Sequence, residues 1–516
     1  MKRHSGWSIG IALLIVLGFL GLASSQQPKA GGTLRVAWEA DLTGLDPYLS
    51  PGVQSWHVVG NLFNSLVTID TNLNYVPDLA ESWEVSEDGK VYVFHLRKGV
   101  KFHEGSDFNA EVVRWNFQRA VDPEENAFIA PFFSIVETVE AVDDHTVKFT
   151  LKHPSQTLLP AIAANRVGFL QMSPASYKKW GKDDVRLHPD GTGPFKLGRW
   201  EQNQAIVLEK NPHYFKPGLP YLDRVELRVM KEGVTRVTAL RAKEVDFANY
   251  IPREHVDRLT KDKQIQVLKG KDTQRVQSFF NLRKPAFQDV RVRKAILGYG
   301  IDRQAIAKTA LLGQAQPLWS CIPPGGMDHV DFGEELAYNP DKAKALLKEA
   351  GFDENTPLRY TIMTHGAEAA LPTIATIIKT QLANIGVDVT VEVIDRPIFL
   401  RRQTKDRDWD QTLNFSGAVL DTYTISRLID SRAGNNTPNH QDPHVDALID
   451  RIKEAPTPEA YRQAGHDLQR YVVAETMIYP SLTTLPFIQA AHSHVKGYEQ
   501  LHGFKIRFET VWLDGR

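Results

Sequence analysis

The sequence lacks most of the features that would assign it a chemistry at once. Cysteine occurs once in 516 residues, at Cys321, so no internal disulfide can form. Neither sign of charge dominates, because 61 lysines and arginines stand against 62 aspartates and glutamates. The net charge of −1 argues against a nucleic-acid-binding protein, which usually has a basic excess. After residue 25 no second long apolar run follows.

Catalytic motifs are missing as well. There is no HExxH, no GxSxG and no Cys/His pairing, so we expect no catalytic residues. A secreted hydrolase stays open as an alternative, because two carboxylates could act as a catalytic pair, but nothing in the sequence singles out two of the 62 acids. The glycine-rich stretch 191–195 lacks the GxxxxGK[ST] pattern and leads into a predicted strand, which favours a turn over a phosphate loop. Cys321 lies among prolines and glycines without a histidine partner, which favours a neutral thiol.

The N-terminus is typical of a secretory signal. Lys2, Arg3 and His4 precede an uncharged apolar run at 9–22, and small residues follow at 23–25. The alternative is a membrane anchor, but the run is short for a span and is followed by a polar stretch, so we expect cleavage of residues 1–25. No cysteine stands near the cleavage site for a lipid anchor. The mature chain is therefore predicted to be exported, to the periplasm.

A pair of hairpins is predicted at 79–105. Alternation through Trp83 and Val85 is interrupted by an Asp-Gly turn at 88–89 and resumes at 91–97. Period two puts Tyr92, Phe94 and Leu96 on one face of that strand. Residues 100–102 are then predicted to form a short third strand.

The rest of the chain predicts a mixed α/β protein. Asn109 is placed to cap a helix that ends near residue 121, and helices are predicted at 57–66, 235–242, 290–298, 303–312, 341–350, 371–384, 443–454 and 458–473. Strands alternate with the later helices, at 358–363 and 387–393, as in an α/β lobe. Because the chain is too long for one core and has no low-complexity linker, we expect two lobes joined by crossing strands.

Five stretches, taken together, carry a family resemblance. They are GGTLRV at 31–36 with LDP at 45–47; residues 79–119; GTGPF at 191–195 with NPHYF at 211–215; FNLRKPAFQDVRVRKA at 280–295 with IDR at 301–303; and NP at 339–340 with AKALLKEAG at 343–351. In this order the chain resembles the extracellular solute-binding proteins of bacterial ABC importers of the peptide/nickel type, which include dipeptide- and oligopeptide-binding proteins.

The resemblance implies a two-lobed periplasmic-binding-protein fold of the large type. Lobe one would comprise 31–277 and 485–516, with an inserted subdomain at about 75–190, and lobe two 283–480. Hinge strands near 279–281 and 480–485 would join them. A monomer would capture a peptide or peptide-like ligand between the lobes and deliver it to an ABC permease, without a cofactor, a metal or covalent chemistry.

The ligand contacts that the resemblance implies lie mainly in DWDQTLNFSGAVLDTY at 408–423. Ser416 stands where relatives have tryptophan, and Val419 where peptide-binding relatives have the acid that holds the α-ammonium. Asp421, two residues later, is a candidate for that role, and a helix cap before 425–429 is the equal alternative. The other candidates, for each of which ordinary surface or core is the alternative, are Tyr423, Phe415, Gly417, Tyr250, Gln277, Asp41, Leu42 and Arg402.

Three further features have a plainer interpretation that we favour. Arg402 belongs to a basic cluster at 396–407 that could take a carboxylate, but interleaved aspartates favour a solvated helix face. His492 and His494 share a strand face, yet surface histidines are favoured over a metal site. The altered 416–421 stretch keeps a non-peptide ligand open, such as an opine, an oligosaccharide or a chelated metal, and a sensory role in place of import stays open too.

Overall fold

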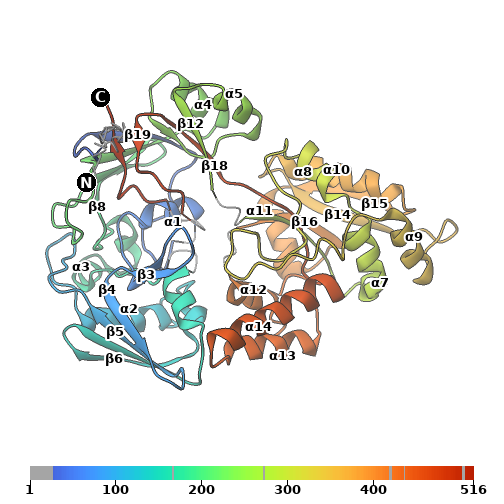
Figure 1. Ribbon diagram of the computed structural model, residues 1–516, viewed down its shortest axis with the longest axis horizontal. Coiled ribbons are helices and arrows are strands. Elements are labelled where there is room, and N and C mark those ends of the chain that lie inside the picture. The colour runs from blue at the N-terminus through green and yellow to red at the C-terminus, as the bar shows by residue number, and fades with distance from the viewer. Residues whose placement is uncertain are drawn as a thin grey trace, which may run out of the picture.

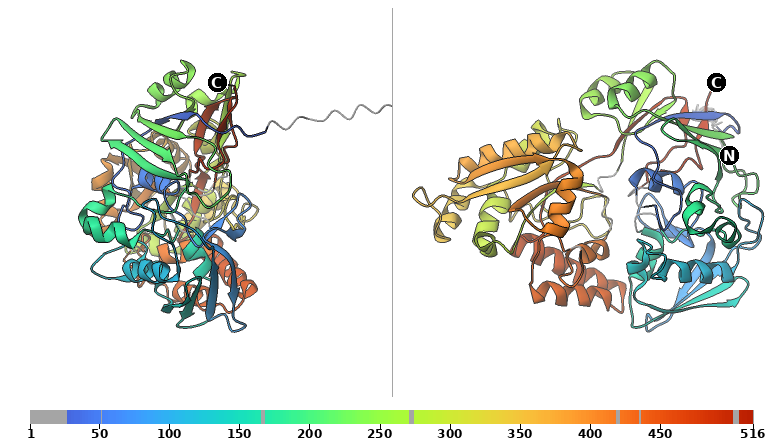
Figure 2. Two further views of the ribbon diagram at one scale, coloured as in Figure 1. Left: turned by 90° about the vertical axis from the view of Figure 1, so that its left-hand side faces the viewer. Right: turned by 180° about the vertical axis from the view of Figure 1, so that it is seen from behind.

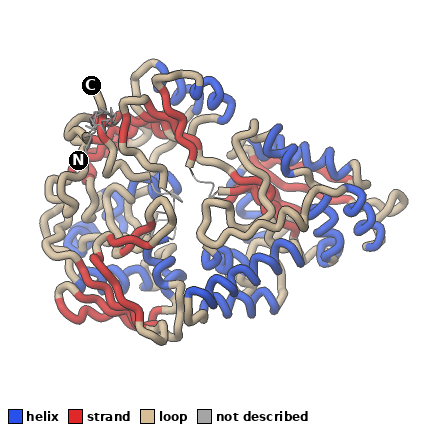
Figure 3. The backbone as a smooth tube through the Cα atoms, viewed as in Figure 1, coloured by secondary structure: helices blue, strands red, loops and turns tan. Residues whose placement is uncertain are grey.

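Two lobes lie side by side in the computed structural model, which describes residues 27–515 except 51, 165–167, 271–273, 418–420, 435 and 502–505 (Figure 1). The predicted signal segment 1–25 and Val419 lie outside the described residues. Each lobe is built around its own sheet, and a smaller third sheet lies at the far end of the first lobe (Figure 3). Among the described residues, no helix combines the length and the apolar character that a bilayer span requires.

A seven-stranded sheet forms the centre of lobe one. In order its strands are β12 (Ile265–Lys269), β18 (Ile488–His492), β11 (Phe247–Ala248), β1 (Thr33–Trp38), β10 (Arg224–Val229), β9 (Ala205–Lys210) and β8 (Phe195–Glu201). β1 runs parallel to both β10 and β11, while β18 is antiparallel to β11 and β12. The carboxyl ends of β1 and β11 therefore lie at the same edge as the start of β18.

A five-stranded sheet forms the centre of lobe two. Its order is β15 (Asp388–Ile394), β14 (Arg359–His365), β16 (Gln411–Ser416), β13 (Arg275–Phe280) and β17 (Ser481–Thr484). β14 is parallel to β15 and β16, and β13 is antiparallel to both β16 and β17. Seen from behind, helix α10 (Ala370–Ala383) lies over β14, β15 and β16 (Figure 2).

The chain passes between the two sheets twice, between β12 and β13 and again between β17 and β18. All six residues of β13 pair with β16, so the first crossing lies before Arg275, some residues earlier than the predicted hinge at 279–281 and the predicted lobe boundary at 277. The return lies between Thr484 and Ile488. The shift has a simple cause, since backbone groups of a buried strand need partners and β13 finds them on both sides in lobe two.

A four-stranded sheet occupies the range predicted for the lobe-one subdomain. Its order is β4 (Ala80–Val85), β5 (Val91–Leu96), β7 (Thr146–Leu151) and β6 (Val136–Asp143). Tyr92, Phe94 and Leu96 are at most 3% exposed, so the predicted hairpin and its buried face are confirmed. The prediction of a third strand at 100–102 was wrong, because Val100 and Phe102 are buried in a loop closed by the bridge between Lys101 and Asp107.

Most predicted helices are confirmed within a few residues. The remaining helices are α1 (Val53–Val59), α2 (Ala110–Val121), α3 (Pro174–Asp184), α4 (Gly233–Arg241), α5 (Val256–Thr260), α6 (Pro285–Gln288), α7 (Val290–Arg293), α8 (Arg303–Thr309), α9 (Pro340–Glu349), α11 (Arg396–Arg401), α12 (Thr422–Ile429), α13 (Pro443–Lys453) and α14 (Pro458–Gln469). Short strands pair as β2 (Val67–Ile69) with β3 (Tyr75–Pro77) and β19 (Val495–Lys496) with β20 (Trp512–Leu513).

Helix α1 differs from the prediction of a helix at 57–66, and the glycine-rich stretch explains why. Gly193 N donates to Leu62 O at 2.9 Å and Phe195 N to Asn61 O at 3.0 Å, so these carbonyls are bound by the loop and not by a continuing helix. A Cβ at Gly191 or Gly193 would overlap the Leu62 backbone. Stretch 191–195 is thus a close-packed turn, as predicted, and its glycines permit the approach.

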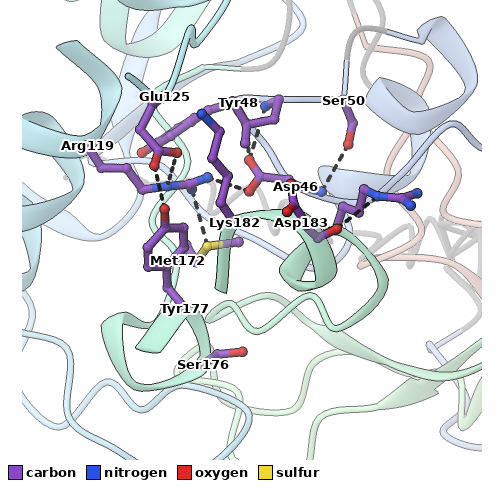
Figure 4. Close-up of polar contacts among 12 residues, drawn as sticks. Asp46, Tyr48, Ser50, Arg119, Glu125, Met172, Ser176, Tyr177, Lys182 and Asp183 are labelled. Atoms are coloured by element: carbon purple, nitrogen blue, oxygen red, sulfur yellow. Dashed lines mark hydrogen bonds and ion pairs between the residues drawn. The ribbon is translucent and has the colours of Figure 1, made fainter. Parts of the chain in front are cut away.

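A buried ion cluster joins two of the stretches that carried the resemblance (Figure 4). Arg119, at the end of α2, contacts Asp46 Oδ2 at 2.5 Å and Glu125 Oε2 at 3.1 Å, and its guanidinium lies over the rings of Tyr48 and Tyr177. The other oxygen of Asp46 accepts from the backbone N of Tyr48. Asp46 is fully buried, so its charge depends on Arg119 for compensation.

Replacing Arg119 tests how much this cluster stabilises lobe one. Arg119→Leu leaves two carboxylates without their cation, and we expect a loss of about 3–5 kcal/mol in the free energy of unfolding, measured by urea titration. The control is Arg114→Leu on the same helix, whose pair with Glu111 is exposed and should cost no more than about 1 kcal/mol. Equal losses for the two variants would contradict the assignment.

Cys321 is buried, as the prediction of a neutral thiol requires, and burial raises the pKa of its thiol to about 12. Because the thiolate is the reactive form, the folded chain should react very slowly with a disulfide reagent at mildly alkaline pH. The same reagent should titrate one thiol per chain in guanidinium chloride. Rapid labelling of the native protein would show that the thiol is accessible and ionised.

Candidate functional site

In each of the two large sheets, the strands that lead into and out of the crossings begin or end at the edge where the parallel strands have their carboxyl ends. In lobe one, β12 ends and β18 begins at the edge where β1 and β11 end. In lobe two, β13 begins and β17 ends at the edge where β16 ends, with the carboxyl ends of β14 and β15 beside it. Ligands of open α/β sheets bind outside the carboxyl ends of the strands. The candidate site is therefore the region between these two edges.

The lobe-one edge carries a cluster of rings. Phe487, which follows the return crossing, lies 4.5 Å from the Tyr250 ring and 5.5 Å from the His57 ring, measured between centroids. His57 in turn packs edge-on against Trp38. Tyr250 has a φ of 50°, in the left-handed region, and Arg236 fixes this turn by donating to the carbonyls of Asn249 and Tyr250.

Glu39, the residue directly after β1, adds a carboxylate to this cluster. Its side chain is 10% exposed, and its Oε2 accepts from Asn249 Nδ2 at 2.8 Å. Burial raises the pKa of Glu39, and the Asn249 amide and the charge of Arg236 oppose that shift. Burial lowers the pKa of His57 to about 3, so His57 is neutral at physiological pH and supplies no compensating charge.

The Asn249 amide is itself held by a chain of hydrogen bonds. Asn249 Oδ1 accepts from Gln489 Nε2 at 2.7 Å, and Gln489 Oε1 accepts from the Tyr498 hydroxyl at 2.7 Å. Burial raises the pKa of Tyr498, which keeps its hydroxyl protonated and able to donate. Groups from the C-terminal part of the chain thereby hold the Asn249 amide in place.

The lobe-two edge combines an aromatic wall with cationic and neutral polar groups. His365 donates from Nε2 to Asn414 Oδ1 at 2.9 Å and accepts at Nδ1 from the backbone N of Ala367, so it is neutral. Its ring packs edge-on against Phe415, and the Arg396 guanidinium lies 5.3 Å from the Phe415 centroid. Phe415, Ser416 and Gly417 are half-buried.

Side chains of the two lobes touch at several points around this region. Arg253 Nη1 lies 2.7 Å from Glu368 Oε1, and the two side chains are 17% and 19% exposed. On the opposite side, the Tyr423 hydroxyl donates to Phe132 O at 3.4 Å and the two rings pack edge-on. Gln156 Nε2 donates to Pro456 O at 3.0 Å. The lobes are thus in contact across the candidate site.

Asp421 lies in lobe two next to a second buried carboxylate. It caps α12, accepting from Thr424 N at 2.8 Å, so the capping alternative is realised. Asp328 nearby accepts from Thr422 N and Oγ1. Burial, aided by the charge of Asp328, raises the pKa of Asp421 to about 6. Capping uses only one oxygen, and the ligand role of Asp421 stays a prediction.

The other predicted residues are bound to groups of their own lobe. Asp41 accepts from Trp200 Nε1 and Asn203 N, both at 2.7 Å, which fastens it to the β8–β9 turn, and Leu42 is buried. Gln277 Oε1 accepts from Arg275 Nη2. Arg402 donates to both oxygens of Glu392 and to Asp408 O, which agrees with the favoured solvated helix face.

Sequence reasoning missed four residues that the fold brings to this region, namely Glu39, Arg253, His365 and Glu368. Glu39 directly follows β1 and His365 ends β14, two residues beyond the strand predicted at 358–363. No local pattern marks Arg253 and Glu368, because their pairing joins residues from different lobes. Only the three-dimensional fold shows that contact.

A pocket of about 590 Å³ lies elsewhere, on lobe one between α3 and β8, with Trp180, His188, Asp190 and Trp200 among its lining residues. No cluster of metal-binding side chains occurs within the described ranges. His492 and His494 stack on each other, but His492 Nε2 contacts Leu240 O and His494 Nε2 contacts Asp246 Oδ1. His492 is buried, so the prediction of a surface histidine is wrong for it, because its ring reaches a backbone carbonyl inside lobe one.

Known proteins resemble this chain in sequence and in fold. Residues 74–437 match the family described as bacterial extracellular solute-binding proteins, family 5 Middle. The glutathione-binding protein GsiB of Shigella dysenteriae serotype 1 is 32% identical over 382 residues, which cover 74% of this chain and 73% of that protein.

Solved structures agree over nearly the whole chain. The periplasmic binding protein DppA of Helicobacter pylori, in complex with the peptide STSA, is 27% identical with a TM-score of 0.79, covering 94% of this chain and 99% of that one. The binding protein AgaA of A. tumefaciens R10, in complex with agropinic acid, is 26% identical with a TM-score of 0.77 at the same coverage. The chain therefore belongs to the family 5 bacterial extracellular solute-binding proteins.

Proposed function

We infer that this protein is the substrate-binding receptor of an ABC import system and captures a peptide or peptide-like solute between its lobes. The observation that carries the proposal is that two sheets present the carboxyl ends of their strands to one region, across which the lobes touch. The names of GsiB and DppA support peptide-like solutes as the ligand class. The receptor would act in the periplasm as a monomer that docks on a permease, without catalysis.

A second ligand class is supported by one relative. AgaA, which is almost as similar in structure as DppA, is described in complex with agropinic acid, a non-peptide solute. An opine-like ligand is therefore the alternative within the same function.

Closure would couple binding to delivery. A ligand that contacts both edges stabilises the closed arrangement by its differential affinity for that arrangement over the open one. Groups that join the lobes without touching ligand, such as Arg253 and Glu368, stabilise the same closed state. Ligand affinity should thus depend on residues outside the site.

A ligand screen tests the proposed class. Glutathione, the peptide Ser-Thr-Ser-Ala and agropinic acid are each added to the purified mature chain, and unfolding is followed by thermal shift. A ligand at 100 times its dissociation constant should add about 2.7 kcal/mol to the free energy of unfolding. We expect a shift with at least one peptide and none with maltose, an uncharged sugar. A shift with agropinic acid alone would favour the opine alternative.

The contact between Arg253 and Glu368 gives a test of closure. Glu368→Gln removes one charge of the pair, and we expect a roughly tenfold weaker affinity, equivalent to about 1.4 kcal/mol, measured by calorimetry with the ligand from the screen. The control is Glu335→Gln, whose pair with Arg470 is exposed and lies within lobe two. Unchanged affinity in Glu368→Gln would mean that the pair does not contribute to the liganded state.

A further inference from the structure

The carboxylate of Glu39 is only partly satisfied by the protein. Oε2 accepts from Asn249, but Oε1 is buried and has no hydrogen-bond donor, the nearest imidazole nitrogen, His57 Nδ1, being 3.9 Å away. The Gln54 side chain lies close enough to favour the charged carboxylate, but it makes no hydrogen bond of normal geometry to Oε1. A buried carboxylate oxygen without a donor is costly, and in a binding protein it marks a place where a ligand group can supply the missing contact.

The cation next to Glu39 is bound elsewhere. Arg236 donates to the carbonyls of Asn249, Tyr250, Met230 and Lys231, so its N–H groups face the backbone. Its charge reaches Glu39 only through space. This differs from Arg119, which lies in direct contact with both of its carboxylates. The charged Glu39 carboxylate would therefore be stabilised strongly by a directly bound cation.

The surroundings of Glu39 suit an ammonium group. The His57 ring lies beside the carboxylate, and the ring of Phe487 packs against it. Tyr250 packs against Phe487 in turn, and both of these residues are only half-buried. Aromatic faces attract cations, and a low-dielectric environment strengthens the attraction between an ammonium and a carboxylate. The Tyr250 hydroxyl is affected by the charges of both Glu39 and Glu368, which places Glu39 close to the lobe contact.

We propose that Glu39 of lobe one is the anchor for the protonated amine of the transported solute, which would thus be a small solute with a primary ammonium group. This inference rests on the proposed function and names the ligand class of the same site. The ammonium donates to Glu39 Oε1, while Asn249 holds Oε2 in place. Because the anchor belongs to lobe one, the solute binds there first and lobe two closes over it.

The test compares ligands with and without the amine charge. The dissociation constants of glutathione and Ser-Thr-Ser-Ala, and of their N-acetylated forms, are measured for the wild type, for Glu39→Gln and for Asp421→Asn. We expect Glu39→Gln to weaken the free-amine ligands by about 10- to 100-fold and the N-acetylated forms by no more than about twofold. The control Glu226→Gln alters a carboxylate that pairs with Arg228 on the neighbouring β10 and should change neither. Circular dichroism checks that each variant is folded.

Two results would overturn the inference while leaving the receptor function intact. One is a wild-type chain that binds peptides but does not distinguish free from acetylated amines. The other is a Glu39→Gln variant that still distinguishes them, as it would if Asp421 held the ammonium, in which case Asp421→Asn loses the distinction. A wild-type chain that binds none of these peptides contradicts the proposed ligand class itself, and the inference fails with it.

Discussion

The two passages of the chain between the sheets determine the geometry on which everything else depends. Each passage links a strand of one sheet to a strand of the other, so the two sheet edges at which these strands begin or end must face each other. Because β1 and β11 are parallel in one lobe and β14 and β15 are parallel in the other, several carboxyl strand ends meet there at once. Site residues far apart in sequence are brought together by this constraint, and none of them needs a local motif.

Local patterns predicted the elements well where one short stretch decides the outcome. The first hairpin of the stretch 79–105, formed by β4 and β5, has its turn and its buried face as predicted, since alternation and an Asp-Gly turn act within a few residues. The prediction failed at 57–66 because a loop more than a hundred residues away binds the carbonyls of Asn61 and Leu62. It also misplaced the crossing at 279–281, since the partners that hold β13 come from β16 and β17.

The candidate site was less accessible to sequence reasoning than the fold. Phe415 and Ser416 end β16 and Tyr250 follows β11 by two residues, so these three lie at the facing edges where the resemblance implied ligand contacts, and their contact with a ligand stays a prediction. Asp41 and Arg402 are engaged by Trp200 and Glu392, and no spacing in the sequence could have shown those partners. Glu39 escaped notice because an acid after a strand is common; what distinguishes it is a buried oxygen without a donor.

The hydrogen-bonded row from Tyr498 through Gln489 to Asn249 has a direction. An ionised carboxylate only accepts hydrogen bonds, so Glu39 requires the amide nitrogen of Asn249. Asn249 Oδ1 then accepts from the Gln489 nitrogen, and Gln489 Oε1 accepts from the Tyr498 hydroxyl. The Tyr498 hydroxyl, which can donate or accept, follows the direction that the carboxylate sets. The groups that hold Asn249 beside Glu39 thus come from the C-terminal part of the chain, which returns to lobe one only after lobe two has been completed.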